Sequence, residues 1–107
     1  MSEARPFNVT LTEQAEGVVV RVLGDIDVVT APVLQRHLDA ALASGRPTVV
    51  IDLSETTFLD ARGVGVLVGA RKKVNGDGGR LVLRRPPALV RRVLEIAEQL
   101  DRMEVEG

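Results

Sequence analysis

Cysteine, tryptophan and tyrosine are all absent from this 107-residue chain. Without cysteine the chain can form no disulfide and offers no thiol nucleophile or thiolate ligand. Its only aromatic residues are Phe7 and Phe58, so it lacks the stacking platforms on which proteins bind single-stranded nucleic acid. The chain has a single histidine, His37, which cannot by itself make up the ligand set of a zinc site. We therefore expect no metal site, no cofactor and no nucleic-acid partner.

Long apolar runs are also missing. No stretch approaches the roughly 20 apolar residues that span a bilayer. The first six residues, Met1 to Pro6, are polar and lack the apolar segment of a signal peptide. We expect a cytoplasmic protein without direct membrane insertion. The length, with 45% hydrophobic and 27% charged residues, is typical of one globular domain over residues 1–107.

The formal net charge of −1 conceals an uneven distribution of charge. From Arg71 to Arg92 the chain carries eight cations and one anion, Asp77. Such a segment can form a basic patch for an acidic partner. The interpretation that we favour is simpler: the cations occupy the solvated faces of one strand and two helices.

Hydrophobic periodicity predicts the elements of the first half of the chain. Alternating apolar residues over 7–11 and an apolar run over 18–23 indicate a β-hairpin. A helix follows to about Ser44, with Thr30 as its expected N-cap. The β-branched run over 48–53 is typical of a central strand, and a polar turn follows it.

The second half alternates helices and strands. A helix from Ala61 or Arg62 to Val74 is apolar nearly all round, so we expect it to be buried on more than one side. Ala61, Gly65 and Gly69 form a small-residue stripe along it, which favours a close approach of another backbone. A strand over 80–84, a helix after Pro86-Pro87 and a short strand through Met103 and Val105 complete the chain.

This order predicts an α/β fold. The βαβ units imply parallel pairing with right-handed crossovers, and the hairpin supplies an antiparallel edge. We expect a small sandwich with a mixed, mostly parallel sheet of four or five strands. About four helices should pack against it.

Four aspartates stand near predicted strand ends: Asp25, Asp27, Asp52 and Asp60. Ligand sites in open α/β sheets favour the carboxyl end of the strands, so a metal or an acid–base pair is one hypothesis. Turn and capping roles are the more probable alternative, and Asp60 in particular can cap the helix that follows it. No nucleophile, base and metal set assembles, so we expect no enzyme.

Three blocks of the sequence resemble the STAS domain, the fold of bacterial anti-sigma factor antagonists. The first, similar to the family's Gly-Glu-Leu-Asp…Thr-Ala…Leu segment, is Gly24-Asp-Ile-Asp-Val-Val-Thr-Ala-Pro-Val-Leu34. The second is Val50-Ile-Asp-Leu-Ser54 with Phe58-Leu-Asp-Ala-Arg-Gly-Val-Gly-Val-Leu67, similar to Val-Asp-Leu-Ser…Phe-Asp-Ser-Ser/Thr-Gly-Leu-Gly-Val-Leu. The third is Gly79-Arg-Leu-Val-Leu83 followed by Val93-Leu94.

The resemblance implies both a partner and a switch. The partner would be an anti-sigma factor that is also a serine kinase of the histidine-kinase-like ATPase fold, and binding it would free a sigma factor. In similar proteins that kinase phosphorylates a serine or threonine just before the motif glycine, and the antagonist then dissociates from the anti-sigma factor. A phosphate on a docking helix terminus changes the charge of the interface sharply. A homodimer is left open as a further arrangement.

Residue by residue, Asp60 matches the motif aspartate and Gly63 the motif glycine. Ala61 matches the first of the two small hydroxyl residues, and Arg62 matches the phosphoacceptor. Neither Ala61 nor Arg62 can be phosphorylated as serine is, so we expect the usual switch to be missing. The expected docking face consists of Asp27, Thr30, Asp60, Ala61, Arg62, Gly63 and Val64, with Arg62 paired to an acidic group of the partner.

Two other classes of function stay open. One is a STAS scaffold or accessory subunit of a transporter or signalling complex. The other is a small sensor of anions or nucleotides that uses the cations between Arg71 and Arg92 and the helix terminus at Asp60.

Overall fold

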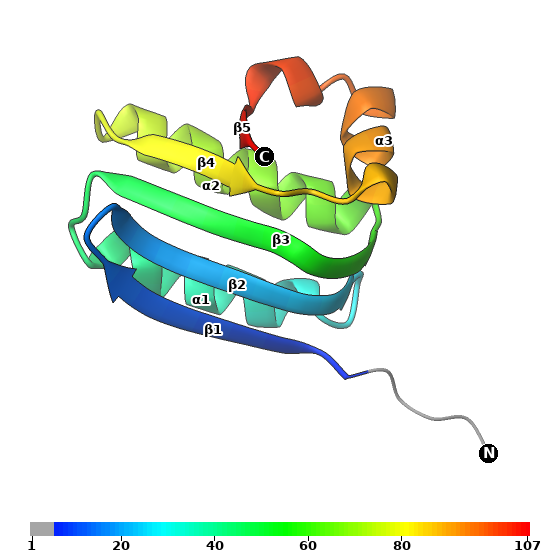
Figure 1. Ribbon diagram of the computed structural model, residues 1–107, viewed down its shortest axis with the longest axis horizontal. Coiled ribbons are helices and arrows are strands. Elements are labelled where there is room, and N and C mark those ends of the chain that lie inside the picture. Colours follow the sequence, from blue (N-terminus) through cyan, green and yellow to red (C-terminus); the bar gives the residue numbers. More distant parts are fainter. Residues whose placement is uncertain (1–5) are drawn as a thin grey trace.

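A computed structural model describes residues 6–107 and contains one five-stranded mixed sheet (Figure 1). The strands lie side by side in chain order: β1 (Asn8–Gln14), β2 (Gly17–Ile26), β3 (Thr48–Leu59), β4 (Arg80–Arg84) and β5 (Glu104–Glu106). The pair β1–β2 is antiparallel and every later pair is parallel. The predicted hairpin, the mixed sheet and the short last strand are confirmed. The prediction that the start of the chain is not a signal peptide concerns mainly residues 1–5, which lie outside the described residues.

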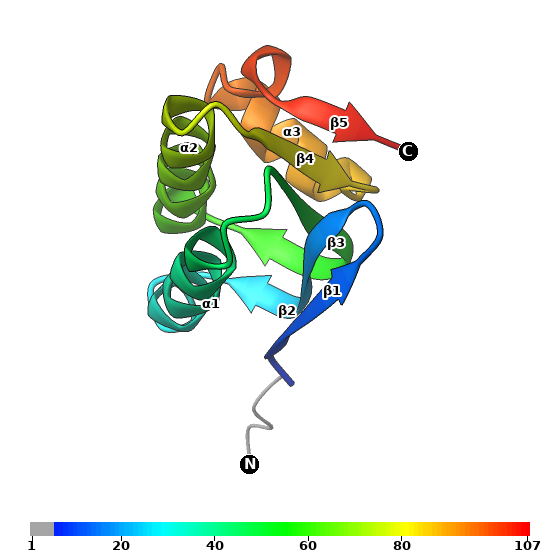
Figure 2. The same ribbon diagram turned by 90° about the vertical axis from the view of Figure 1, so that its left-hand side faces the viewer.

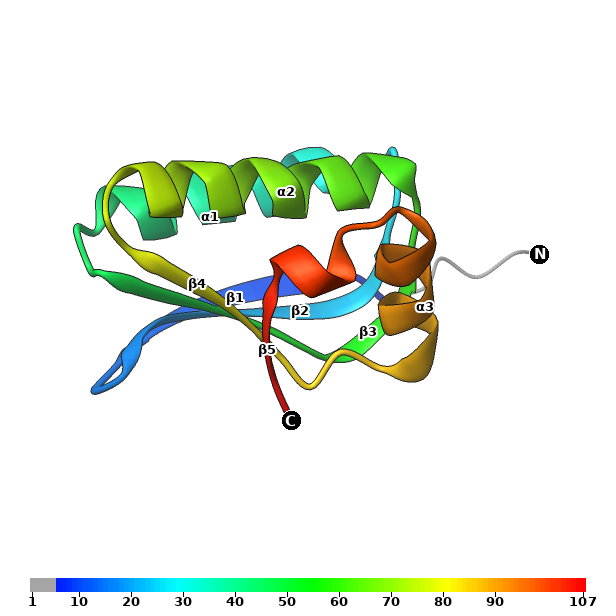
Figure 3. The ribbon, with the colours of Figure 1, turned by 90° about the horizontal axis from the view of Figure 1, so that it is seen from above.

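Three α-helices connect and cover the sheet: α1 (Ala31–Ala43), α2 (Ala61–Gly76) and α3 (Ala88–Ile96). In the described part of the chain the remaining helical segment is one 3-10 turn, Leu100–Arg102. The predicted number of about four helices was therefore slightly too high, because the chain after α3 has room for only a single turn before β5. Helices α1 and α2 lie along one face of the sheet, and α3 stands at the end where β2 and β3 finish (Figure 3).

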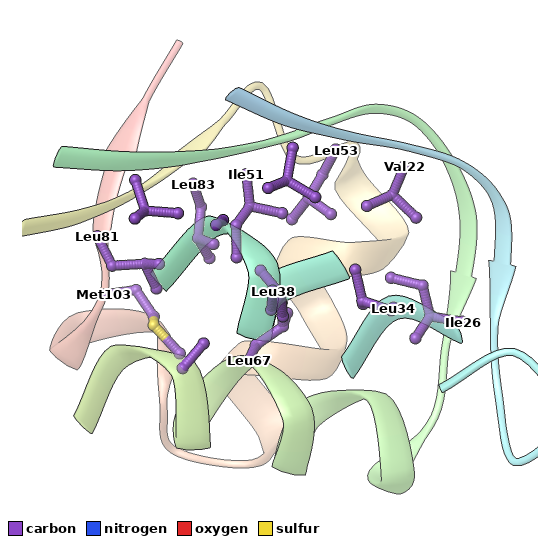
Figure 4. Close-up of a cluster of buried hydrophobic side chains, with 14 of the residues drawn as sticks. Val22, Ile26, Leu34, Leu38, Ile51, Leu53, Leu67, Leu81, Leu83 and Met103 are labelled. Carbon is purple, nitrogen blue, oxygen red and sulfur yellow. The ribbon is translucent and has the colours of Figure 1, made fainter. Parts of the chain in front are cut away.

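The main core lies between the sheet and the helices (Figure 4). Leu38 of α1 and Leu67 of α2 face Ile51 and Leu53 of β3 and Leu83 of β4, and all five side chains are fully buried. Burying a leucine or isoleucine side chain stabilises a fold by roughly 1.5–3 kcal/mol. This shared core fixes α1 and α2 on the sheet, and with them the loops at their starts.

The other face of the sheet has a smaller apolar cluster, formed by Val19, Val50 and Val82. Arg80 and Arg84 flank Val82 on this face, since alternate residues of a strand point the same way. Arg80 pairs with Glu104, and its hydrogen bond holds the pKa of the Glu104 carboxyl below its ordinary value. These long charged side chains shield the valines, so the face is polar toward solvent.

Strand β3 is six residues longer than the sequence predicted, because it continues from Leu53 to Leu59. The expected polar turn over this stretch was wrong. Strand β2 also continues, to Ile26, and its parallel pairing with β3 holds as far as Ile26 opposite Leu59, through two register shifts. The buried Thr56 hydroxyl donates to the carbonyl of Val22 at 3.0 Å, so this polar residue is satisfied inside the sheet.

Helix α2 packs against both α1 and the sheet, as expected, and Val66 and Val68 beside its buried face are half-buried against the core. Its buried residues follow helical spacing: Gly63, Val64, Leu67, Ala70 and Val74. The small-residue stripe faces outward: a Cβ atom at Gly65 or Gly69 would meet no neighbouring side chain or other element within 4 Å. The predicted close backbone approach to this stripe is therefore wrong.

Gly63 is the glycine of α2 that packing requires. A Cβ atom there would lie 2.5 Å from Leu59 Cδ1 and 2.7 Å from Ile26 Cγ2, closer than carbon atoms can approach. The start of α2 therefore sits directly on the ends of β2 and β3.

Two glycine-to-alanine variants test this difference. Both gain the same helix propensity, but Gly63→Ala must also displace Leu59 and Ile26, an overpacking cost of about 1–3 kcal/mol. We expect Gly69→Ala to raise the free energy of unfolding by about 1 kcal/mol. The free energy of unfolding of Gly63→Ala should be lower than that of Gly69→Ala by the overpacking cost. Urea unfolding measures both, and equal stabilities would contradict the packing role of Gly63.

Candidate docking site at the start of α2

Asp60 caps helix α2, as the sequence predicted. Its carboxylate accepts a hydrogen bond from the Gly63 N–H at 3.0 Å, and its carbonyl accepts one from the Val64 N–H at 2.9 Å. Its own N–H donates to the carbonyl of Ile26 at 3.1 Å. Asp60 therefore fixes the start of α2 both to the helix and to the end of β2. The negative cap also opposes an anion at this terminus, which weakens the case for a phosphate or nucleotide sensor.

The four residues after Asp60 divide into an exposed and a buried pair. Ala61 and Arg62 are exposed, whereas Gly63 and Val64 are buried. Within residues 6–107 the Arg62 guanidinium has neither a hydrogen bond nor an ion pair. A cation in the first turn also gains nothing from the helix dipole, which favours negative charge there. Arg62 thus contributes no hydrogen bond or ion pair to the described part of the fold, and its charge is available to a partner.

The loop between β2 and α1 lies beside this turn and is held by hydrogen bonds of Asp27 and Thr30. Asp27 Oδ1 accepts hydrogen bonds from the backbone N–H groups of Val29 at 2.9 Å and Thr30 at 3.1 Å. The bond from the Thr30 N–H holds the pKa of the Asp27 carboxyl below its ordinary value. The Thr30 hydroxyl donates to the carbonyl of Asp25 at 2.6 Å and accepts from the Asp27 N–H at 2.9 Å.

Thr30 was expected to cap α1, but its side chain makes no capping hydrogen bond. The reason is that a helical turn already forms over residues 27–31, where the Ala31 N–H donates to the Asp27 carbonyl at 2.8 Å. Asp27 therefore takes the capping role, and Thr30 instead ties the loop back to Asp25.

Several large apolar side chains are exposed on the elements that meet at this end of the molecule. Val28 and Val29, in the loop held by Asp27, are 58% and 76% exposed, and Ile96 at the end of α3 is 70% exposed. Phe58 and Leu89 are also exposed, on β3 and α3. Of these, Val28 and Val29 are adjacent, and adjoining exposed apolar side chains are typical of interaction sites. Sequence reasoning missed most of this set, although two valines inside a loop between Asp27 and Thr30 were a usable signal.

Two shallow hollows flank the first turn of α2, and both include Ala61. One, of about 330 Å³, lies toward α1 and is lined by Gln35, Ala61, Arg62, Gly65 and Val66. The other, of about 320 Å³, lies toward α3 and is lined by Ala61, Val64, Val93, Ile96 and Ala97. The first contains the Arg62 charge, and the second is lined by apolar side chains alone.

The four aspartates do not form one cluster. Asp27 and Asp60 lie at the carboxyl end of the sheet, where Asp25 of β2 also lies. Asp52 lies in the middle of β3, opposite Arg21 and Arg84, because β3 continues beyond it. Among the described residues no group of three histidine, aspartate or glutamate side chains is placed to hold a metal ion.

The remaining candidates have structural roles. His37 lies on α1, and its Nδ1 is 2.8 Å from the carbonyl oxygen of Val33, one turn back. The cations of the segment from Arg71 to Arg92 do not form one free patch, since Lys73, Arg80, Arg84 and Arg92 each pair with a carboxylate. This favours the interpretation that the segment supplies solvated faces.

The lowered pKa of Asp27 predicts how acid affects the loop. The charged carboxylate is favoured in the folded state, so its stabilising contribution is present at neutral pH and is lost as the pH falls through its folded-state pKa. An NMR titration of Asp27 should give a pKa below the ordinary value of about 3.9. The variant Asp27→Asn should flatten the pH dependence of unfolding between neutral and acidic pH, and an unchanged dependence would refute this role.

Comparison with known proteins agrees with this architecture. The family model described as "Mlab, STAS domain" matches residues 9–104. The anti-sigma-B factor antagonist of Bacillus subtilis (strain 168) is 32% identical over 99 residues, which cover 92% of this chain and 90% of that relative. The anti-sigma F factor antagonist of Lysinibacillus sphaericus is 29% identical over 83 residues, covering 77% of this chain and 71% of the relative.

In the described residues no helix is long and apolar enough to cross a membrane.

Solved structures give the same result. A crystal structure of an anti-sigma factor antagonist from Mycobacterium paratuberculosis matches with a TM-score of 0.84 and 28% identity, over 100% of this chain and 91% of that one. The anti-sigma factor antagonist SpoIIAA in its unphosphorylated form matches with a TM-score of 0.76 and 22% identity, over 95% and 89%, which shows a common fold. This chain belongs to the STAS domain family.

Proposed function

We propose that this protein is an anti-sigma factor antagonist that binds a kinase-type anti-sigma factor through the start of α2 and so releases a sigma factor. We further propose that it is not phosphorylated at the position of the usual acceptor. It acts as a binding protein rather than an enzyme, and it acts in the cytoplasm, where sigma factors bind RNA polymerase.

The similarity to anti-sigma factor antagonists along nearly the whole chain supports the general role. The observation that carries the specific proposal is Arg62 at the position matched to the acceptor, exposed and without a hydrogen bond or ion pair among residues 6–107, on a helix start that is otherwise intact. Asp60 still caps the helix, and Gly63 still packs on β2 and β3. The proposed docking site thus keeps its backbone framework, while arginine takes the place of the residue that can be phosphorylated.

Charge decides how this site would differ from a phosphorylated one. A phosphoserine carries about −1.5 to −2 charges at neutral pH, whereas the Arg62 guanidinium carries one positive charge. A negative group here would repel an acidic partner surface, and Arg62 instead attracts one. Asp27 and Thr30 hold the neighbouring loop in place beside Arg62. We infer that the protein is permanently competent to bind and that its concentration, rather than phosphorylation, sets its effect.

The first test mixes the purified chain with its cognate kinase-type anti-sigma factor and ATP. We expect a complex by calorimetry, and no added phosphate on the peptide containing Ala61 to Gly63 by mass spectrometry. Arg62→Ser is the matched control, because it restores a hydroxyl on the same scaffold and should become phosphorylated. Absence of any complex would refute the proposal, and co-purification with a transporter ATPase would favour an accessory module instead.

The sign of the charge at position 62 provides a second test. Arg62→Glu replaces a cation by an anion on an exposed helical residue, so the fold should be retained. We expect the dissociation constant for the anti-sigma factor to rise by about tenfold or more, since a tenfold change corresponds to about 1.4 kcal/mol. Arg62→Lys keeps the charge and should change affinity much less. Equal affinities for the glutamate and lysine variants would exclude an acidic group opposite Arg62.

A further inference from the structure

The apolar hollow between α2 and α3 is a second contact region beside the proposed docking turn. Its walls are Val64 in the first turn of α2, Val93 and Ile96 on α3 and Ala97 directly after α3, with Ala61 at the rim. Neither the sequence motifs nor the similarity to the family pointed to α3 as part of a site. Figures 1 and 3 show α3 standing at the same end of the sheet as the start of α2.

The lining of the hollow determines what it can hold. No charged side chain lines it, so a polar or charged ligand would lose its hydration without finding a partner. Its volume of about 320 Å³ is at the lower end of the range of about 300–1,000 Å³ for ligand pockets. Apolar anchors that fill small pockets dominate the energy of many protein interfaces. The hollow therefore suits one aliphatic or aromatic side chain.

Charge around the hollow distinguishes a different protein from a second copy of this chain. Ala61 borders the hollow and is followed directly by Arg62, which is exposed and unpaired among the described residues. A twofold dimer centred on this turn would place Arg62 against its own copy, and like charges repel. A partner with an acidic group beside an apolar one satisfies both features at once.

We propose that the hollow between α2 and α3 receives one apolar side chain of the anti-sigma factor, next to the acidic group that meets Arg62. This inference rests on the proposed function and adds α3 to its interface. Ile96 is the main contact, since it is the most exposed large side chain of the hollow. The expected surface of the partner is thus an acidic residue with an aliphatic or aromatic residue close beside it.

The test compares Ile96→Glu with Ala40→Glu in calorimetry against the cognate anti-sigma factor. Both variants place a glutamate on an exposed helical residue, but Ala40 lies on α1, outside both hollows. We expect Ile96→Glu to weaken binding by about tenfold or more and Ala40→Glu to leave it within about twofold. Circular dichroism melts of both variants should match the wild type, which separates lost contact from lost folding.

Each outcome has a definite meaning. If the wild type binds and Ile96→Glu binds equally well, the hollow is not part of the interface, while the proposed function stands. If the wild type does not bind, the proposed function fails and this inference fails with it. If sedimentation shows that the wild type self-associates and that Ile96→Glu abolishes this, the occupant is a second copy and the inference is overturned.

Discussion

The parallel pairing of β2 with β3 is the constraint on which the candidate site depends. It continues to Ile26 opposite Leu59, so both strands finish at the same point of the sheet. The hydrogen bond from the Asp60 N–H to the Ile26 carbonyl then joins the ends of β2 and β3. Because the two strands end together, the loop held by Asp27 and the first turn of α2 form one surface.

The close contact of Gly63 with Ile26 and Leu59 connects this surface to the core. Both side chains belong to the main apolar cluster, so the position of the helix start is determined by core packing rather than by solvent-exposed contacts. An interface built on packed elements is ordered before a partner arrives, which lowers the entropic cost of binding. Figure 2 shows the helix pair α1 and α2 lying together on one side of the sheet, which supports both loops.

Much of the fold could be predicted from the sequence, because its signals are local. The alternation in residues 7–11 gave the hairpin, and the cap at Asp60 was readable from one aspartate before an apolar helix. The length of β3 could not be predicted in this way. Ser54, Thr56 and Thr57 have turn-like polarity, and only pairing with the extended β2 makes them strand residues. The start of α1 after Thr30 was predicted, but the capping carboxylate of Asp27 was not, because nothing in the local pattern distinguishes Asp27 from Thr30.

The sequence by itself determined the order of the elements and the family, since each of these is encoded in adjacent residues, and it predicts that Arg62 stands where similar proteins have the acceptor residue. Only the tertiary structure decided which glycine of α2 is packed, because Gly63, Gly65 and Gly69 look alike until Ile26 and Leu59 are placed. It also decided that α3 borders the start of α2. That contact joins residues about 30 positions apart in the chain, and no periodicity reports on such a distance.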